Sequence, residues 1–98
     1  MDSMDISGKY ISRARDVRYK EMDAKSVLLD LNSGSYYTLN ELGNFIWGML
    51  DGKRNAAQIT EAVINSYEVD RDGASKDVGA LIHRLKEEGL VRLHDESQ

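Results

Sequence analysis

The stretch LLDLNSGSYYTLNELG at residues 28–43 constrains the fold most strongly. Apolar side chains at every second position predict a strand over residues 26–31. Asn32-Ser33-Gly34 then predicts a three-residue hairpin turn, in which Gly34 adopts the positive φ that a side chain disfavours. The chain returns as an antiparallel strand over residues 35–39 and enters a helix at once. This stretch therefore predicts a hairpin packed beside a helix.

A third strand and a layer of helices complete the predicted architecture. Residues 17–22 alternate loosely and indicate a strand before the hairpin. A sheet of at most three strands needs a partner layer to be stable, and three helices after the hairpin supply that layer. We therefore predict an α+β fold that is winged-helix-like, with a three-stranded antiparallel sheet followed by a three-helix bundle.

The first helix is expected to start close to the returning strand. Thr38 and Glu41 match a capping box, and Asn40 is the competing cap. Apolar residues at helical spacing follow, and Gly52 ends the helix. Trp47 lies off the apolar stripe of this helix, yet we expect it in the core, where large aromatic side chains usually pack.

The second and third helices have clearer ends in the sequence. Asn55, followed by Gln58, opens the second helix, and Asp70 caps the third. Gly89 stops the third helix, and residues 90–93 form a short extended coda. The chain contains no proline, so every helix end depends on glycine or on a polar cap.

Length and composition limit the classes of function. The 98 residues suffice for one domain, which we place at residues 17–93, between a flexible arm at residues 1–16 and a tail at residues 94–98. Without cysteine the chain has no disulfide, thiolate metal site or cysteine nucleophile. No apolar run reaches the roughly 20 residues that span a bilayer, and the first residues lack the apolar segment of a signal peptide. We therefore expect a cytoplasmic protein without a membrane partner.

No group of residues has the spacing of a catalytic or metal site. Asp30, Asn32 and Glu41 have the spacing of an EF-hand loop. Ser35, however, stands where that loop needs glycine, so a hairpin turn and a helix cap explain these residues better. The two histidines have no ligand spacing around them, and the glycines do not cluster before a helix as in phosphate-binding loops. We expect no catalytic residue, no metal and no cofactor.

The charge distribution argues against a nucleic acid as partner. Residues 26–98 carry seven basic and twelve acidic residues, a net charge of −5, whereas phosphate binding needs an excess of cations. A winged helix would place the first turns of its third helix in the major groove, and here those turns carry Asp70, Asp72 and Asp77. A winged-helix DNA-binding or transcription-regulatory protein is therefore only the alternative hypothesis.

The returning strand suggests a different role. It is the last strand of the predicted meander, so its outward N–H and C=O groups are unpaired unless another segment covers them. Ser35-Tyr36-Tyr37-Thr38 has no lysine, proline or bulge to protect that edge. An open edge beside an amphipathic helix is a docking place for an extended peptide. The other interpretation is that a helix or the N-terminal arm covers the edge.

The order of several short patterns carries a resemblance to a known family. The stretch at residues 28–43 is followed by Phe45-Ile46-Trp47, LDG at residues 50–52, YEVD at residues 67–70 and GLV at residues 89–91. Over residues 17–93 the chain resembles the PqqD-like family, the stand-alone precursor-peptide recognition elements of ribosomally made, modified peptides. Its hairpin is closer in form to members that serve lasso peptides or other products than to those of the pyrroloquinoline quinone pathway.

The resemblance implies a non-catalytic adaptor. Family members bind the leader of a precursor peptide as an added strand, between the third strand and the third helix. They present it to a modifying enzyme such as a radical-SAM maturase or a leader peptidase. On this chain the matching peptide-binding residues are Ser35, Tyr36, Tyr37 and Thr38 on the strand and Lys76, Val78, Leu81, Ile82, Arg84 and Leu85 on the helix. The sequence leaves open which face of the third helix lines the groove, and whether two copies form a homodimer through the edge strand.

Overall fold

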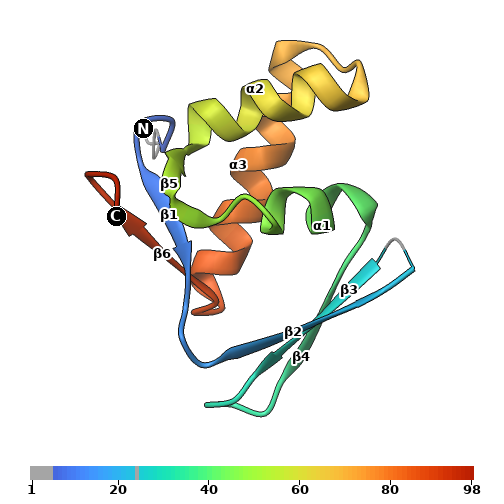
Figure 1. Cartoon of the computed structure of the whole chain (residues 1–98), viewed down its shortest axis with the longest axis vertical. Helices are drawn as coiled ribbons and strands as arrows, with labels where there is room; N and C mark the ends of the chain where they lie inside the picture. The colour runs from blue at the N-terminus through green and yellow to red at the C-terminus, as the bar shows by residue number, and fades with distance from the viewer. Residues whose placement is uncertain (1–5, 24) are drawn as a thin grey trace.

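The structure is a computed structural model that describes residues 6–23 and 25–98. Over these residues it is a mixed α+β structure with three helices and two three-stranded antiparallel sheets (Figure 1). The helices are α1 (Glu41–Trp47), α2 (Ala56–Tyr67) and α3 (Arg71–Glu87). The strands are β1 (Tyr10–Arg13), β2 (Val17–Met22), β3 (Lys25–Asp30), β4 (Tyr36–Leu39), β5 (Asp51–Asn55) and β6 (Val91–His94).

The predicted hairpin and the strand before it form one of the two sheets, in the order β2-β3-β4. β3 pairs antiparallel with both neighbours, and Val27 lies opposite Lys20 on one side and Thr38 on the other. The turn after β3 closes as predicted, because Gly34 has a φ of 76° and its N–H donates to the Asp30 carbonyl over 2.7 Å. The predicted meander is therefore confirmed.

The sequence does not predict the other sheet, which has the order β5-β1-β6. We expect residues 1–16 to form an arm, but Tyr10–Arg13 form the middle strand of this sheet; residues 1–5 lie outside the described residues. A four-residue strand is too short to show a period. Its partners also lie far along the chain, since Tyr10 is opposite both Asn55 and His94. No local pattern reveals such a pairing.

Asn40, and not Thr38, caps α1. The Asn40 side chain accepts a hydrogen bond from the Gly43 N–H over 2.8 Å, while Thr38 is still part of β4 and pairs with β3. α1 also ends earlier than predicted, with Gly48 as its C-cap. Gly52 lies in β5 with a φ of 80°. The capping box at Thr38 and the helix end at Gly52 are therefore both wrong.

The predicted caps of α2 and α3 are confirmed. Asn55 and Gln58 each accept a side-chain hydrogen bond from the other's backbone N–H, both over 2.9 Å. Asp70 accepts a hydrogen bond from the Gly73 N–H over 2.7 Å at the start of α3. Gly89 follows α3 with a φ of 77°, and the coda after it is β6. These caps are local interactions, so their spacing in the sequence is enough to find them.

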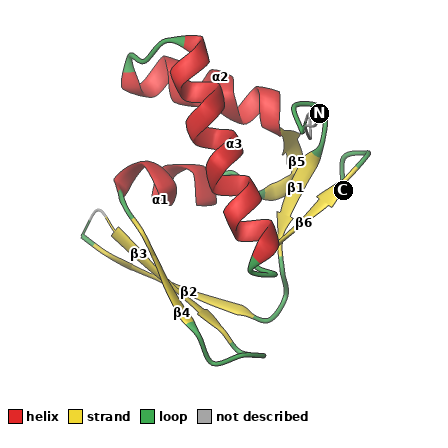
Figure 2. Cartoon of the chain, turned by 180° about the vertical axis from the view of Figure 1, so that it is seen from behind, coloured by secondary structure: helices red, strands yellow, loops and turns green. Residues whose placement is uncertain are grey.

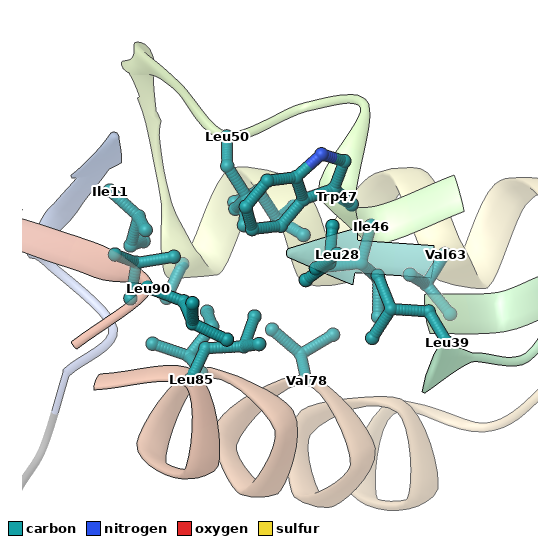
Figure 3. Close-up of a cluster of buried hydrophobic side chains, with 14 of the residues drawn as sticks. Ile11, Leu28, Leu39, Ile46, Trp47, Leu50, Val63, Val78, Leu85 and Leu90 are labelled. Atoms are coloured by element: carbon teal, nitrogen blue, oxygen red, sulfur yellow. The ribbon is translucent and has the colours of Figure 1, made fainter. Parts of the chain in front are cut away.

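The core lies where the helices meet both sheets (Figure 3). Ile11 from β1, Leu28 from β3 and Ile82 from α3 are fully buried. Trp47 is confirmed as a core residue, with 1% of its surface exposed. The Arg13 guanidinium lies 5.2 Å from the centre of the Trp47 ring and donates to the Trp47 carbonyl over 2.8 Å, so it fastens β1 to the end of α1. Within the described residues no helix is long and apolar enough to cross a bilayer.

Candidate peptide-binding site

The outer edge of β4 faces away from the rest of its sheet. Antiparallel strands alternate between hydrogen-bonded and non-bonded residue pairs. The Asp30 N–H donates to the Ser35 carbonyl over 3.0 Å, and this bond fixes the alternation. In steps of two from Ser35, the main-chain groups of Tyr37 and Leu39 bond to β3. The residues between them, Tyr36 and Thr38, therefore point their main-chain groups outward.

The other side of β3 agrees with this alternation. The Leu31 N–H donates to the Asp16 carbonyl over 2.8 Å, so odd-numbered residues of β3 bond toward β2 and even-numbered ones toward β4. Among residues 6–23 and 25–98, nothing bonds to the outward main-chain groups of Tyr36 and Thr38. The edge is open in the described chain, because β1 belongs to the other sheet and no helix bonds to the edge.

A groove lies between β4, α1 and α3 on the helix side of this edge, and Figure 2 shows these three elements together. Its cavity volume is about 450 Å³. β4, the turn after it and α1 contribute Thr38, Leu39, Asn40, Leu42, Gly43 and Ile46, and α3 contributes Asp77, Ala80, Leu81 and Arg84. The groove therefore combines apolar side chains with two opposite charges on α3.

The predicted strand residues reach the edge and the groove in different ways. Tyr36 is 69% exposed, and Thr38 lines the groove. Ser35 precedes β4, and its carbonyl faces β3. Tyr37 is half-buried, and its hydroxyl donates to the Glu88 carboxylate over 3.0 Å. That bond ties β4 to the residue that follows the last turn of α3.

The groove face and the core face of α3 are distinct. Leu81 and Arg84 line the groove, while Lys76 is exposed and lines neither of the two cavities described for this molecule. The remaining predicted helix residues are buried in the core: Val78, Ile82 and Leu85. These three residues support the groove wall from behind, so the structure does not bring them to the groove surface.

Seven groove residues are missing from the sequence prediction: Leu39, Asn40, Leu42, Gly43, Ile46, Asp77 and Ala80. A signal for two of them exists, since steps of four residues back from Leu81 and Arg84 reach Asp77 and Ala80 on the same face. The sequence, however, carries two overlapping stripes on this helix, and periodicity alone does not say which stripe faces the core.

The contact with Glu88 changes the ionisation of Tyr37. The hydrogen bond to the Glu88 carboxylate, the partial loss of water and the negative charge of that carboxylate together raise the pKa of the Tyr37 phenol above its ordinary 10.0. The neutral phenol is the donor in this bond, so the link between β4 and α3 is intact at neutral pH.

A polar network fixes the β2-β3-β4 sheet on α1. The Asn44 side-chain oxygen accepts hydrogen bonds from the Ser26 hydroxyl of β3 and, over 2.7 Å, from the Tyr19 hydroxyl of β2. The Asn44 amide nitrogen donates to the Glu21 carboxylate over 3.2 Å. Ser26 is fully buried, so the network gives a buried hydroxyl its partner and holds the inner face of the sheet against α1.

A second cavity, of about 280 Å³, lies between the N-terminal segment, α2 and α3. Its lining includes Ile6, Arg71 and His83, and Arg71 is paired with Glu61. The other histidine, His94, is on β6. No group of three or more potential metal ligands occurs in the part of the chain that the structure describes.

Comparison with known families decides the family of this chain. Residues 25–91, more than half of the chain, match the sequence model of the family described as Coenzyme PQQ synthesis protein D (PqqD). The chain belongs to the PqqD family. The matched range contains β3, β4, the three helices and the groove of this PqqD-family protein. No curated protein matches the chain.

Two solved structures are similar to this PqqD-family chain. One is "TbiB1 in Complex with the TbiA(beta) Leader Peptide", with 30% identity and a TM-score of 0.76 over 83% of this chain and 94% of that one. The other is "Lasso peptide synthetase B1 complexed with the leader peptide", with 31% identity and a TM-score of 0.72 over 85% of this chain and 98% of that one. Both relatives hold a leader peptide, and they give no support to the DNA-binding alternative.

Proposed function

We propose that this chain binds the leader of a ribosomally made precursor peptide by strand addition at β4, and that it is not itself an enzyme. The observation that carries the proposal is the open edge of β4 beside a groove of about 450 Å³. An exposed edge supplies main-chain bonds for affinity, and side-chain pockets beside it supply specificity. The similar structures support the proposal, because each is a complex with a leader peptide.

The edge and the groove have separate tasks in this mechanism. Tyr36 and Thr38 each offer one N–H and one C=O to the incoming strand. Leu42 of α1 and Leu81 of α3 are half-buried and both line the groove, where they would contact apolar side chains of the peptide. Burying one such side chain is worth about 1.5–3 kcal/mol before the cost of ordering the peptide. Main-chain bonds would thus align the leader, and apolar contacts would hold it.

Strand addition also explains how a small protein presents a peptide. An added strand pairs with β4 along one of its own edges, so its other edge remains accessible to a second protein. We propose that this second protein is a modifying enzyme, such as a radical-SAM maturase or a leader peptidase. In this division of labour the chain recognises the leader, and its partner performs the chemistry on the rest of the precursor.

We propose that the helices and the small sheets form a winged-helix-like arrangement that has no role in DNA binding. Asp70, Asp72 and Asp77 place three negative charges at the start of α3, where DNA phosphates would be repelled.

An open edge also allows two copies to pair. If a dimer forms through β4, added leader should compete with it and shift the protein toward monomers in sedimentation experiments.

The function is tested by selection followed by mapping. A displayed library of short linear peptides is selected on the immobilised chain, and the best binder is titrated into isotopically labelled protein while amide chemical shifts are recorded. We expect the largest shifts at residues 36–38 and 77–84. If no linear peptide is enriched, or if the shifts are confined to the second cavity, the proposed function is wrong.

A further inference from the structure

Two opposite charges stand on the groove wall that α3 provides. Asp77 and Arg84 both line the groove, and neither forms an ion pair within the described chain. About two helical turns separate them, which is roughly 10 Å along the axis of α3. Both side chains are exposed, so both can meet a charge on a ligand.

The wall between the two charges is apolar. Ala80 and Leu81 lie between them on α3, and Leu42 of α1 lines the groove as well. Leu42 and Leu81 are half-buried, so each keeps part of its apolar surface open. In the direction of α3 the groove therefore offers a negative charge, an apolar section and a positive charge, in that order.

β4 and α3 run in opposite directions along the groove. The Tyr37 hydroxyl bonds to Glu88, one turn beyond Arg84, so the start of β4 lies at the positive end of the groove. Figure 3 shows Leu39, at the end of β4, on the Val78 side of the core cluster, toward the negative end. A strand that pairs antiparallel with β4 therefore passes from the negative end of the groove to the positive end.

We propose that this groove reads the order of charges in the leader, and that it prefers a basic, an apolar and an acidic residue at alternate positions from the N-terminal to the C-terminal side. This inference rests on the proposed function and names the class of peptide that the site takes. Alternate side chains of a strand point to one side, roughly 7 Å apart. The two charged residues of such a peptide are thus roughly 14 Å apart, and flexible side chains bridge the difference from the roughly 10 Å between Asp77 and Arg84.

The same two charges disfavour binding of a peptide whose charges are in the reverse order. A peptide with the reverse order, bound in the same direction, places its acidic residue beside Asp77 and its basic residue beside Arg84. Like charges across an interface suppress the wrong partner and fix register. Glu88, an acidic group one turn beyond Arg84, already accepts a hydrogen bond from the Tyr37 hydroxyl. Asp77 and Arg84 are therefore specificity residues, whereas the β4 edge supplies affinity for any extended chain.

The test exchanges the two charges without changing the net charge. The exchange variant combines Asp77→Lys with Arg84→Glu. The matched control combines Asp72→Lys with Lys86→Glu, the same kinds of change at exposed positions of α3 outside the groove. The wild type and both variants select peptides from one displayed library of short peptides, after circular dichroism has shown that they fold alike. If the exchange variant does not fold, Asp77→Asn with Arg84→Gln replaces it, and the charge preference should then vanish.

The wild type and the control should enrich the order basic–x–apolar–x–acidic, and the exchange variant should enrich the opposite order. We expect the Kd values of the two orders to differ by about tenfold for each protein. A nitroxide label at the N-terminal end of the bound peptide should broaden amide signals near Asn40 and spare those near Ser35. If the selected peptides have an apolar centre but no preferred order of charges, or if all three proteins select the same order, this inference is wrong and the proposed function is unaffected. If no peptide binds, or if binding does not shift the β4 signals, the proposed function itself fails.

Discussion

The two sheets of this molecule are built in opposite ways (Figure 1). The β2-β3-β4 sheet is one continuous stretch, residues 17–39, in which each strand pairs with its neighbour in the sequence. The β5-β1-β6 sheet collects three segments that lie far apart in the chain. On its β5 side the Gln98 N–H donates to the Gly52 carbonyl over 2.8 Å. The β4 side of the other sheet has no such partner among the described residues.

This difference assigns different tasks to the two sheets. The β5-β1-β6 sheet joins the chain before β2, the chain between α1 and α2, and the chain after α3, so it holds the helices together. The β2-β3-β4 sheet gives one face to the core and leaves the β4 edge unpaired within the described residues. Free edges promote unwanted pairing between copies, so an edge that is kept open is informative about function. One sheet closes the fold, and the other carries the candidate site.

The largest expected effect is on stability and comes from the β5-β1-β6 sheet. Ile11→Ala removes a fully buried side chain of β1 and should lower the free energy of unfolding by about 2–5 kcal/mol, as measured by urea denaturation. The folded protein should still bind the selected peptide with unchanged Kd, because Ile11 belongs to the β5-β1-β6 sheet and not to the sheet that carries the β4 edge. A large rise in Kd under conditions where the variant is folded would contradict the separation of tasks. Ile11→Val offers a milder version of the same test.

A smaller loss of stability is expected where the β2-β3-β4 sheet meets α1. Asn44→Ala leaves the buried Ser26 hydroxyl without its acceptor, which should cost about 1–3 kcal/mol. Ser26→Ala in the same protein should recover part of this loss, since no buried hydroxyl then remains unpaired. The measurement is a double-mutant cycle of unfolding free energies. Strictly additive losses would show that the two side chains do not act together.

Proline substitutions at two neighbouring positions of β4 test which residue faces the open edge and which one pairs with β3. Tyr36→Pro removes an outward N–H and should raise the Kd for the selected peptide about 3- to 10-fold, with little loss of stability. Tyr37→Pro removes an N–H that bonds to β3, so it should mainly lower the unfolding free energy. Calorimetric titration and urea denaturation of both variants give the comparison. Equal effects of the two changes on stability would show that the alternation along β4 is misassigned.

The smallest expected effect concerns the bond between β4 and α3. Glu88 raises the pKa of Tyr37, so Glu88→Gln should lower that pKa toward 10.0, as followed by the ultraviolet absorbance of tyrosinate. Because the folded-state pKa is raised, the bond stabilises the fold below pH 10 and loses this contribution as the pH rises through the raised pKa. Tyr37→Phe is the matched control, since it removes the titrating group itself. An unchanged Tyr37 titration in Glu88→Gln would contradict the assignment.

The parts of the fold that the sequence predicts are those set by local chemistry. The hairpin follows from Gly34, and the caps of α2 and α3 follow from Asn55 and Asp70. β1 and β5 are missed because their pairing depends on contacts between distant segments. Thr38 is wrongly chosen as a cap because its spacing to Glu41 fits, while tertiary pairing keeps Thr38 in the strand.

The candidate site also has one part that the sequence predicts and one part that it does not. The exposed β4 edge is predictable from the absence of protecting residues over positions 35–38. The groove wall on α3 is not predictable from the sequence, because Leu81 and Val78 belong to adjacent stripes of the helix that are both apolar. Packing of α3 against α2 and the core decides that Val78 turns inward, while Leu81 lines the groove. Asp77 is read from the sequence only as a charge that repels DNA, since its place in the groove depends on that choice of face.

The most direct test of the account is amide hydrogen exchange along β4, with and without the selected peptide. Tyr37 and Leu39 should be protected in both states, because their N–H groups bond to β3. Tyr36 and Thr38 should exchange rapidly in the free protein and become protected when the peptide binds. Protection of Tyr36 and Thr38 before any peptide is added, or rapid exchange at both residues in the saturated complex, would contradict strand addition at β4.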